Sequence, residues 1–192
     1  MKFSQKKLIM LLTLSLIFFI NTKPTIAMPD MNPAFNEVIF HIGEGDKITT
    51  ANLSQYKGKI ILVFFGYTHC PDICPLTLMD IKKALDGLGE NAKRVQPIFI
   101  SVDYKRDSPR TLKQYTQYFD KRILGVTSDK KNIDKINKFF RTTYALLDHD
   151  TENYLVEHSS NLYIIDKSLY VKKILPSGLP GTEIIKAIKP LL

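Results

Sequence analysis

Residues 59–75 have the sequence KIILVFFGYTHCPDICP, which decides the fold and contains both cysteines of the chain. Residues 59–66 are a nearly continuous run of apolar, β-branched and aromatic side chains, which is typical of a strand buried on both faces of a sheet. Cys70 and Cys74 follow, where this strand should lead into a helix. Open α/β sheets place their functional sites at such junctions, so the stretch predicts both a buried central strand and the position of a site.

Strand and helix patterns alternate along the rest of the chain. Apolar residues at helical spacing follow Cys74, Pro109 and Asp129. The expected elements, in order, are a strand at 59–66, a helix at 78–88, a strand at 95–102, a helix from 109, a short strand at 122–126, a helix at 129–141, a hairpin of strands at 162–165 and 169–174, and a closing helix around 184–191. This order predicts an α/β protein of thioredoxin-like architecture, with a central mixed sheet and helices on both faces.

The first 27 residues have the pattern of an export signal. Lys2, Lys6 and Lys7 precede an apolar run at 8–20, and small residues end at Ala27. A basic start, about 7–15 apolar residues and small residues before the cleavage point are typical of secretory signals, whereas a spanning helix usually needs about 20. We expect cleavage after Ala27, with retention as a membrane anchor through residues 8–20 as the alternative. Either outcome places the remainder in the periplasm or on the outer face of the inner membrane.

The remaining chain is expected to form a linker at 28–35 and one domain at 36–192. The full chain has a formal net charge of +8, and residues 1–27 hold four Lys and no acid, so residues 28–192 carry about +4. This mildly basic composition lacks an Arg-rich cluster and does not favour nucleic acid as a partner. Acidic protein patches and anionic lipid headgroups are compatible with it.

Three uses of the cysteine pair compete. A structural disulfide would close a very small loop, which removes little entropy from the unfolded chain and so stabilises least. A redox-active dithiol usually has two residues between its cysteines, whereas three separate Cys70 from Cys74. Metal binding fits best, because two sulfurs at positions i and i+4 near a helix N-terminus can point the same way and ionise readily.

Two thiolates need at least one further ligand, and the chain offers four histidines. His41 lies in an early polar stretch and His149 between two aspartates, so both are expected in exposed loops. His69 lies beside the first cysteine and should point elsewhere. His158 closely precedes the apolar strand at 162–165, where a turn can hold its ring over the helix N-terminus. Two sulfurs and one imidazole suit Cu(I), and also Cu(II) with an added ligand, although ligand type alone also allows Zn²⁺.

Two separated motifs resemble the Sco/SenC family. The segment GYTHCPDICP at 66–75 matches the family pattern Y-T-x-C-P-x-x-C-P, and YLVEHSS at 154–160 matches its distant D/E-H-S-S histidine. A third segment, DYKRDSP at 103–109, resembles the family's D-P-x-R-D-T-P, with Tyr104 where proline is usual. The resemblance runs from about residue 57 to 192, and the combination of paired cysteines with the distant histidine is highly specific.

The resemblance implies a thioredoxin-like fold in which Cys70, Cys74 and His158 bind a copper ion. It also implies a metallochaperone that assists assembly of the dinuclear copper centre of cytochrome c oxidase, outside the membrane. The expected partners are the oxidase subunit that holds this centre or another copper chaperone. Three charged residues become candidates for supporting the site or contacting a partner: Arg106, Asp107 and Glu157. The alternatives are a helix cap for Asp107 and solvent exposure for the other two.

Two other classes of function stay open. A metallochaperone turns nothing over, whereas a thiol–disulfide reductase would use Cys70 and Cys74 to keep the copper-ligand cysteines of the partner reduced. Reductases of this fold usually place a cis-proline before a later strand, but residues 158–161 contain no proline. The peroxidase pattern P-x-x-x-T-x-x-C is unmet, since Val63 and Tyr67 stand at its proline and threonine. A module that senses copper or redox state is the third class.

Overall fold

The apolar run after Lys59 forms β3 (Ile60–Gly66), the central strand of the main sheet, and all of its residues are buried. The structure is a computed structural model that describes residues 30–44, 47–147 and 153–192. The strand order of the main sheet is β5-β4-β3-β8-β9. Its other strands are β4 (Val95–Ser101), parallel to β3; β5 (Leu124–Val126), parallel to β4; β8 (Leu162–Ile165), antiparallel to β3; and β9 (Val171–Leu175), antiparallel to β8. The predicted mixed sheet and its hairpin are therefore confirmed.

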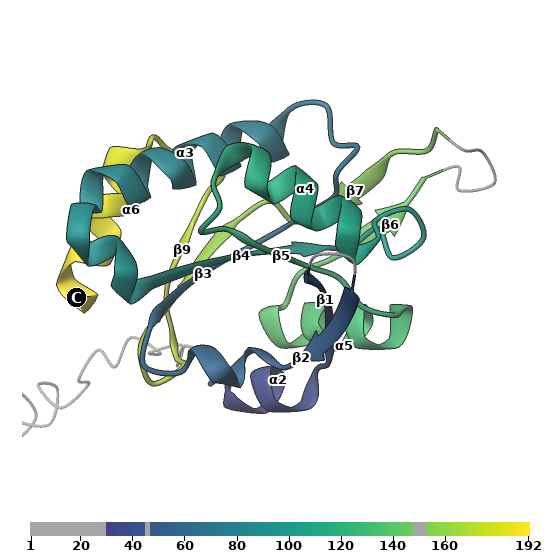
Figure 1. Ribbon diagram of the computed structural model, residues 1–192, viewed down its shortest axis with the longest axis horizontal. Coiled ribbons are helices and arrows are strands. Elements are labelled where there is room, and N and C mark those ends of the chain that lie inside the picture. The colour runs from purple at the N-terminus through teal and green to yellow at the C-terminus, as the bar shows by residue number, and fades with distance from the viewer. Residues whose placement is uncertain (1–29, 45–46, 148–152) are drawn as a thin grey trace, which may run out of the picture.

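Helices cover both faces of this sheet (Figure 1). Because successive strand residues point to opposite faces, the odd-numbered residues of β3 pack into one layer and the even-numbered residues into the other. The first layer contains α2 (Asn32–Glu37), α5 (Lys130–Phe140) and the hairpin of β1 (Phe40–Glu44) and β2 (Lys47–Ala51). The second layer contains α3 (Ile73–Leu88), α4 (Pro109–Phe119) and α6 (Gly181–Ile188). Three 3₁₀ helices lie between or after these elements: η1 (Leu53–Tyr56), η2 (Gly89–Arg94) and η3 (Lys189–Leu191). This is the predicted thioredoxin-like α/β fold.

The starts of α4 and α5 follow from their capping residues. Ser108 Oγ accepts a hydrogen bond from the backbone N–H of Thr111 at 3.1 Å. Asp129 does the same for the N–H of Asn132 at 2.8 Å. Each cap satisfies an amide that the first helical turn leaves without a backbone partner. In α4 the capping residue is Ser108, and Pro109 follows in the first turn, where its missing N–H costs no hydrogen bond.

The C-terminal ends of β3 and β4 meet at one edge of the sheet, because the two strands are parallel. The N–H of Val102 donates to the carbonyl of Gly66 at 2.9 Å and holds the two strand ends together. The loops that follow, 67–72 and 102–108, are therefore neighbours. The cysteines and the segment DYKRDSP come together at this edge.

The expected linker differs from the structure. Residues 32–37 form α2, and the side chains of Met31, Ala34 and Phe35 are fully buried in the core. Together with Val38 they recur at intervals of three and four residues, which is the spacing of one face of a helix. The domain thus includes residues from 31 onward. The sequence did not predict this helix, because its apolar stripe is short and two prolines lie close to it.

Residues 28 and 29 and the predicted export signal lie outside the described residues. Within residues 30–44, 47–147 and 153–192, no helix is long and apolar enough to cross a membrane.

Phe35→Ala tests whether α2 belongs to the folded core. The ring of Phe35 lies 6.3 Å from that of Phe140 on α5, so truncation leaves a cavity between the two helices. We expect the free energy of unfolding, measured with urea, to fall by about 3–5 kcal/mol. The control is Asn36→Ala on the exposed side of the same helix, which should change it by no more than about 0.5 kcal/mol. Equal small effects would show that this segment behaves as a linker.

Candidate metal centre

The loop after β3 places the two cysteines at the N-terminus of α3. Cys70 lies in the loop and is half-buried, whereas Cys74 lies in the first turn of α3 and is buried. Both are free thiols. The N–H of Cys70 donates to the carbonyl of Tyr67 at 3.3 Å, which turns the chain back toward the sheet. Unpaired amides and the positive end of the helix dipole favour thiolates at this position.

Gly66 makes room for the second sulfur. A Cβ atom at this position would lie 2.6 Å from Sγ of Cys74 and 2.6 Å from Cε2 of Phe99. Both contacts are closer than atoms of these kinds approach in folded proteins, so the last residue of β3 must be glycine for Cys74 to occupy its place. The glycine is required here by close approach and not by an unusual backbone angle.

His158 reaches the cysteines from a separate hairpin. It ends β7 (Val156–His158), which, among the described residues, pairs with β6 (Tyr144–Leu146) in a two-stranded sheet separate from the main one. Its Nε2 lies 3.7 Å from Sγ of Cys74. The ring stands edge-on to those of Tyr67, at 5.8 Å and 85°, and Phe64, at 6.4 Å and 77°. Aromatic neighbours on two sides therefore restrict the rotation of the imidazole.

The tautomer of His158 follows from its second nitrogen. Nδ1 lies 3.1 Å from the carbonyl oxygen of Ser159. A carbonyl can only accept, so Nδ1 carries the proton, and in the neutral ring Nε2 keeps its lone pair directed toward the sulfurs. Metal-binding histidines commonly have such a hydrogen bond at their other nitrogen.

The ligand atoms of Cys70, Cys74 and His158 all lie within 4.8 Å of one another. One small ion can therefore contact both sulfurs and the nitrogen at once. Two soft sulfur donors with one imidazole suit Cu(I), and also allow Zn²⁺ or, with an added ligand, Cu(II). The structure thus brings together the three residues predicted as ligands.

The two sulfurs differ strongly in acidity. A hydrogen bond from the Cys74 thiol lowers the pKa of Cys70 to about 5, against the opposing effect of burial. The same hydrogen bond, followed by burial and repulsion from the Cys70 thiolate, raises the pKa of Cys74 well above its ordinary value. Without metal, Cys70 is the thiolate and Cys74 the thiol that donates to it.

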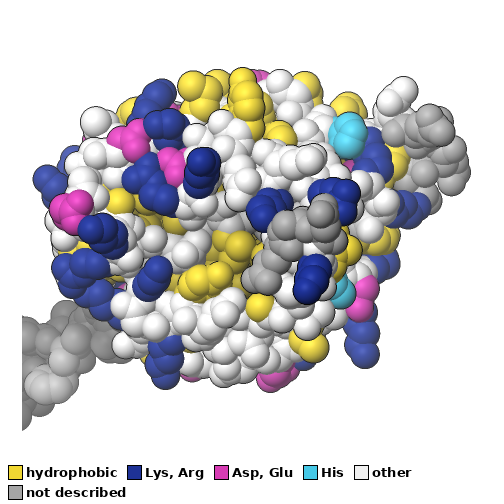
Figure 2. Space-filling view, in the orientation of Figure 1, with side chains coloured by type: hydrophobic (Ala, Val, Ile, Leu, Met, Phe, Trp, Pro, Cys, Tyr) yellow, Lys and Arg dark blue, Asp and Glu magenta, His cyan; other side chains and the backbone are white. Residues whose placement is uncertain are grey.

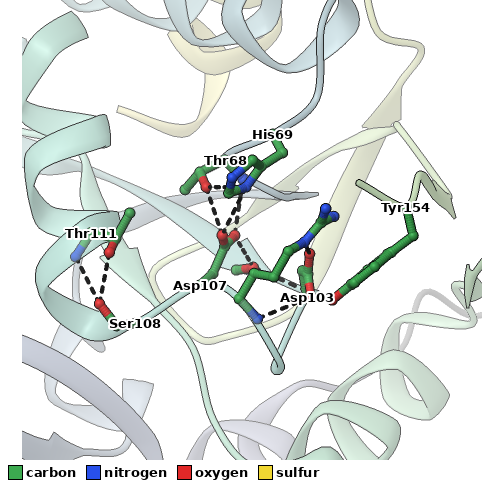
Figure 3. A network of polar contacts seen from close by, with 9 residues as sticks. Thr68, His69, Asp103, Asp107, Ser108, Thr111 and Tyr154 are labelled. Atoms are coloured by element: carbon green, nitrogen blue, oxygen red, sulfur yellow. Dashed lines mark hydrogen bonds and ion pairs between the residues drawn. The ribbon is translucent and has the colours of Figure 1, made fainter. Parts of the chain in front are cut away.

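Asp107 holds the cysteine loop in place (Figure 3). Its fully buried carboxylate accepts hydrogen bonds from the N–H of Thr68 at 2.9 Å, from Oγ1 of Thr68 at 2.6 Å and from Oγ of Ser101 at 2.5 Å. Burial raises its pKa, and these three donors act in the opposite direction. Asp107 therefore supports the site by joining the end of β4 to the loop before Cys70. It does not cap α4, which is capped by Ser108.

Arg106 also lies close to the site and contacts two buried residues there. Its Nε donates to Oδ2 of the buried Asp103 at 2.6 Å, and its guanidinium carbon lies 3.5 Å from the ring centroid of Tyr154. Figure 3 shows the Tyr154 side chain directed toward Asp103, and Tyr154 lies in the segment just before β7. Of the two alternatives for Arg106, the solvated charge is wrong, because its side chain is only 16% exposed.

The other candidates lie apart from the three ligands. The His69 side chain is 55% exposed and turns toward Asp107, with 3.9 Å between Nδ1 and Oδ1. His41 belongs to β1 and is half-buried, so its expected place in an exposed loop is wrong. Glu157 is exposed, which leaves it no part in orienting His158. His149 lies outside the described residues.

Four residues of the site were not assigned to it from the sequence: Phe64, Gly66, Ser101 and Tyr154. Only Gly66 left a local signal, since a glycine that ends a buried strand commonly marks a close backbone approach. The others act across the sheet edge, and their partners are distant in the sequence.

Two large apolar side chains are exposed on the helix that carries Cys74. Leu76 and Met79, on the first turns of α3, are 51% and 47% exposed. Figure 2 shows hydrophobic side chains gathered along the top of this view, over α3. Exposed apolar residues on the helix that carries Cys74 suit contact with another protein.

The fold and site define a thioredoxin-like domain with a Cys–Cys–His centre. The family model SCO1/SenC matches residues 42–192. An SCO2-like protein of Rickettsia prowazekii (strain Madrid E) is 35% identical over 140 residues, which cover 72% of this chain and 68% of that protein. Bradyrhizobium japonicum ScoI with copper bound has a TM-score of 0.71 and 32% identity, over 81% of this chain and 98% of that chain. Yeast Sco1 with copper bound has a TM-score of 0.69 and 28% identity, over 79% and 85%. This chain belongs to the SCO1/SenC family.

Cys70 should alkylate as a thiolate from mildly acidic pH. We expect the iodoacetamide rate of the reduced, metal-free protein to rise with a midpoint near pH 5, the pKa of Cys70. Because folding lowers this pKa from 9.0, the folded state gains stability as the pH rises from about 5 to 9 and loses it as the pH falls again. Cys74→Ala removes the thiol that donates to the Cys70 sulfur, so the midpoint for alkylation of Cys70 should move to higher pH in this variant. A midpoint near 9 in the unaltered protein would contradict the assignment.

Asp107→Asn should loosen the cysteine loop. An amide presents a donor group where the carboxylate accepts from both Thr68 and Ser101, so buried donors lose their partner. We expect the free energy of unfolding in urea to fall by about 1–3 kcal/mol. The control, Asp86→Asn, breaks only exposed ion pairs and should change it by no more than about 0.5 kcal/mol. A change no larger than the control's would refute this role of Asp107.

Proposed function

We propose that this protein binds copper through Cys70, Cys74 and His158 and acts as a metallochaperone. The observation that carries the proposal is the convergence of two sulfurs and one imidazole nitrogen within 4.8 Å. The copper-bound state of the similar ScoI and Sco1 structures supports copper over zinc as the ion. The finer proposal is that the copper serves assembly of the dinuclear copper centre of cytochrome c oxidase.

The arrangement suits a cargo that must be released as well as held. Cys70 is half-buried at the rim, whereas Cys74 is fully buried beneath it. An acceptor thiolate can therefore replace Cys70 first, then His158 and Cys74, so that copper always keeps some ligands during exchange. The half-exposed Leu76 and Met79 offer the acceptor an apolar contact on α3, the helix that carries Cys74. The acceptor is the oxidase subunit that holds the dinuclear centre, or another copper chaperone.

The proposed place of action is the periplasm or the outer face of the inner membrane. The support is the basic and apolar pattern of residues 1–27, which is typical of an export signal or anchor. Export would bring the copper site to the side of the membrane on which the proposed assembly takes place.

Thiol–disulfide reduction is the second candidate, and the lowered pKa of Cys70 favours it. The Cys70 thiolate would attack a disulfide of the partner and form a mixed disulfide. Cys74 would then displace the partner as a dithiol, which leaves a Cys70–Cys74 disulfide that needs an external thiol reductant to return.

A copper titration of residues 28–192, with both cysteines reduced, tests the main proposal. We expect one tight equivalent, and a loss of affinity of more than about a hundredfold in Cys70→Ser, Cys74→Ser and His158→Ala, since even residues that only orient a ligand cost about 10–100-fold. His69→Ala is the matched control and should keep the affinity, because its side chain is 55% exposed and is not among the three residues that converge. Near-unchanged binding in all three ligand variants would end the copper proposal. Weak binding together with rapid thiol exchange would favour the reductase.

A further inference from the structure

The metal centre is divided between two parts of the fold. The cysteines follow β3 of the main sheet, whereas His158 ends a two-stranded hairpin that shares no strand with that sheet. The position of the imidazole therefore depends on whatever fixes the hairpin to the sheet. Asp103, Arg106 and Tyr154 connect the hairpin to the end of the main sheet. Tyr154 is distant from the other two in the sequence, so no local pattern predicts their contacts.

The first contact is a buried hydrogen bond. Tyr154 precedes β7 and is 6% exposed, and its hydroxyl donates to Oδ1 of Asp103 at 2.5 Å. Asp103 follows β4 and is fully buried. Burial, followed by the hydrogen bond to Asp103, raises the pKa of Tyr154 to about 12, so its hydroxyl stays protonated as the donor. The hairpin is thereby bound to the end of the central sheet.

The second contact is the guanidinium of Arg106. It donates from Nε to Oδ2 of Asp103 at 2.6 Å and stacks on the Tyr154 ring, with 3.5 Å between Cζ and the ring centroid. A buried carboxylate is costly without a charged partner, and a planar guanidinium can pair with it while stacking on an aromatic face. Asp103, Arg106 and Tyr154 thus depend on one another.

The group of three reaches His158 through Tyr67. The guanidinium carbon of Arg106 lies 5.9 Å from the ring centroid of Tyr67, and the ring of His158 lies 5.8 Å from the same ring. The phenol oxygen of Tyr67 also accepts a hydrogen bond from the backbone N–H of Val156 in β7. A shift of the hairpin would therefore break contacts at Arg106 and at Tyr67 together.

We propose that Asp103, Arg106 and Tyr154 form a clasp that positions His158 over the two cysteines. Its value for copper rests on the proposed function, but the clasp itself is a property of the metal-free chain. None of the three is among the ligand residues, so they are positioning residues. They hold the hairpin in the position, relative to the main sheet, that directs Nε2 of His158 toward Cys74.

Other contacts keep the domain folded, and the hairpin near its place, when the clasp is weakened. The hydroxyl of Tyr144 donates to Asp134 of α5 at 2.6 Å, and the Tyr144 ring meets that of Tyr104 at 6.4 Å. Tyr104, which stands where the family pattern has proline, thus adds a contact between the 103–107 loop and the hairpin. Variants of the clasp should therefore loosen the hairpin without unfolding the domain.

Amide hydrogen exchange and histidine ¹⁵N spectra of the full-length, metal-free chain in detergent test the clasp. The variants are Tyr154→Phe, which keeps the ring, and Arg106→Gln. The control is Arg122→Gln, which also loses an Arg–Asp pair but at a surface distant from the cysteines. The reporting amides are those of Leu147 and Ser159, which donate across the hairpin to Leu155 and Thr143 at 2.9 Å each.

Both clasp variants should exchange these two amides faster by about tenfold to a hundredfold, which is the effect of a hydrogen bond to a charged group. The ¹⁵N signals of His158 should lose the bias toward a proton on Nδ1, while amides of β3 and β4 and the control variant stay unchanged. Hairpin exchange and His158 signals like those of the unaltered chain would overturn the proposal. Equal acceleration in β3 and β4 would also overturn it, because the residues would then stabilise the whole domain and not the position of His158. A chain that binds no copper would refute the proposed function alone, since these measurements need no metal.

Discussion

The complete burial of β3 is the constraint on which the rest of the structure depends. Seven consecutive buried residues need an apolar layer on each face, and the chain supplies one with α2, α5 and β1 and the other with α3, α4 and α6. Since α3 covers the strand that precedes it, the loop between them must turn at the C-terminal edge of the sheet. This turn leaves the cysteines at a helix N-terminus, where amides and helix dipole favour thiolates. The same edge receives the end of the parallel strand β4, and with it two buried carboxylates.

Those carboxylates, Asp103 and Asp107, connect the cysteine loop and the hairpin to the same strand end. The hydroxyl of Ser101 donates to Asp107 and accepts from the N–H of Asp103, so the two acids belong to one hydrogen-bonded network. Asp107 fixes the loop before Cys70, whereas Asp103 lies under the Arg106–Tyr154 stack beside the hairpin. Burying a charge carries a large desolvation cost. Here each carboxylate offsets it by accepting hydrogen bonds from several donors. The donors to Asp107 and Asp103 thus connect the cysteine loop and, through the proposed clasp, the hairpin of His158 to one strand end.

The unequal environments of the two sulfurs shape how an ion would enter and leave. Cys74 fills the space that Gly66 leaves beside Phe99, and it has little freedom to move. Cys70 lies at the rim as a thiolate and can exchange partners without disturbing the core. A centre with one rigid and one accessible sulfur combines retention with transfer, which a pair of equally buried sulfurs would not do.

The sequence by itself determined the local features: the buried strand, the order of helices and strands, the cysteine pair at a helix start and, with the family resemblance, His158 as the third predicted ligand. These follow from periodicity, capping chemistry and spacing, which act over a few residues. The sequence did not predict features whose pattern spans only a few residues or whose contacts join residues far apart in the chain. The helical stripe around Phe35 spans only two turns beside prolines, and the β6–β7 hairpin pairs through strands of three residues each. Only the tertiary structure decided that Arg106 is stacked on Tyr154 and that Nε2 of His158 meets Cys74, 84 residues away. Such contacts depend on how separate elements pack at the sheet edge, and no local preference of the chain encodes them.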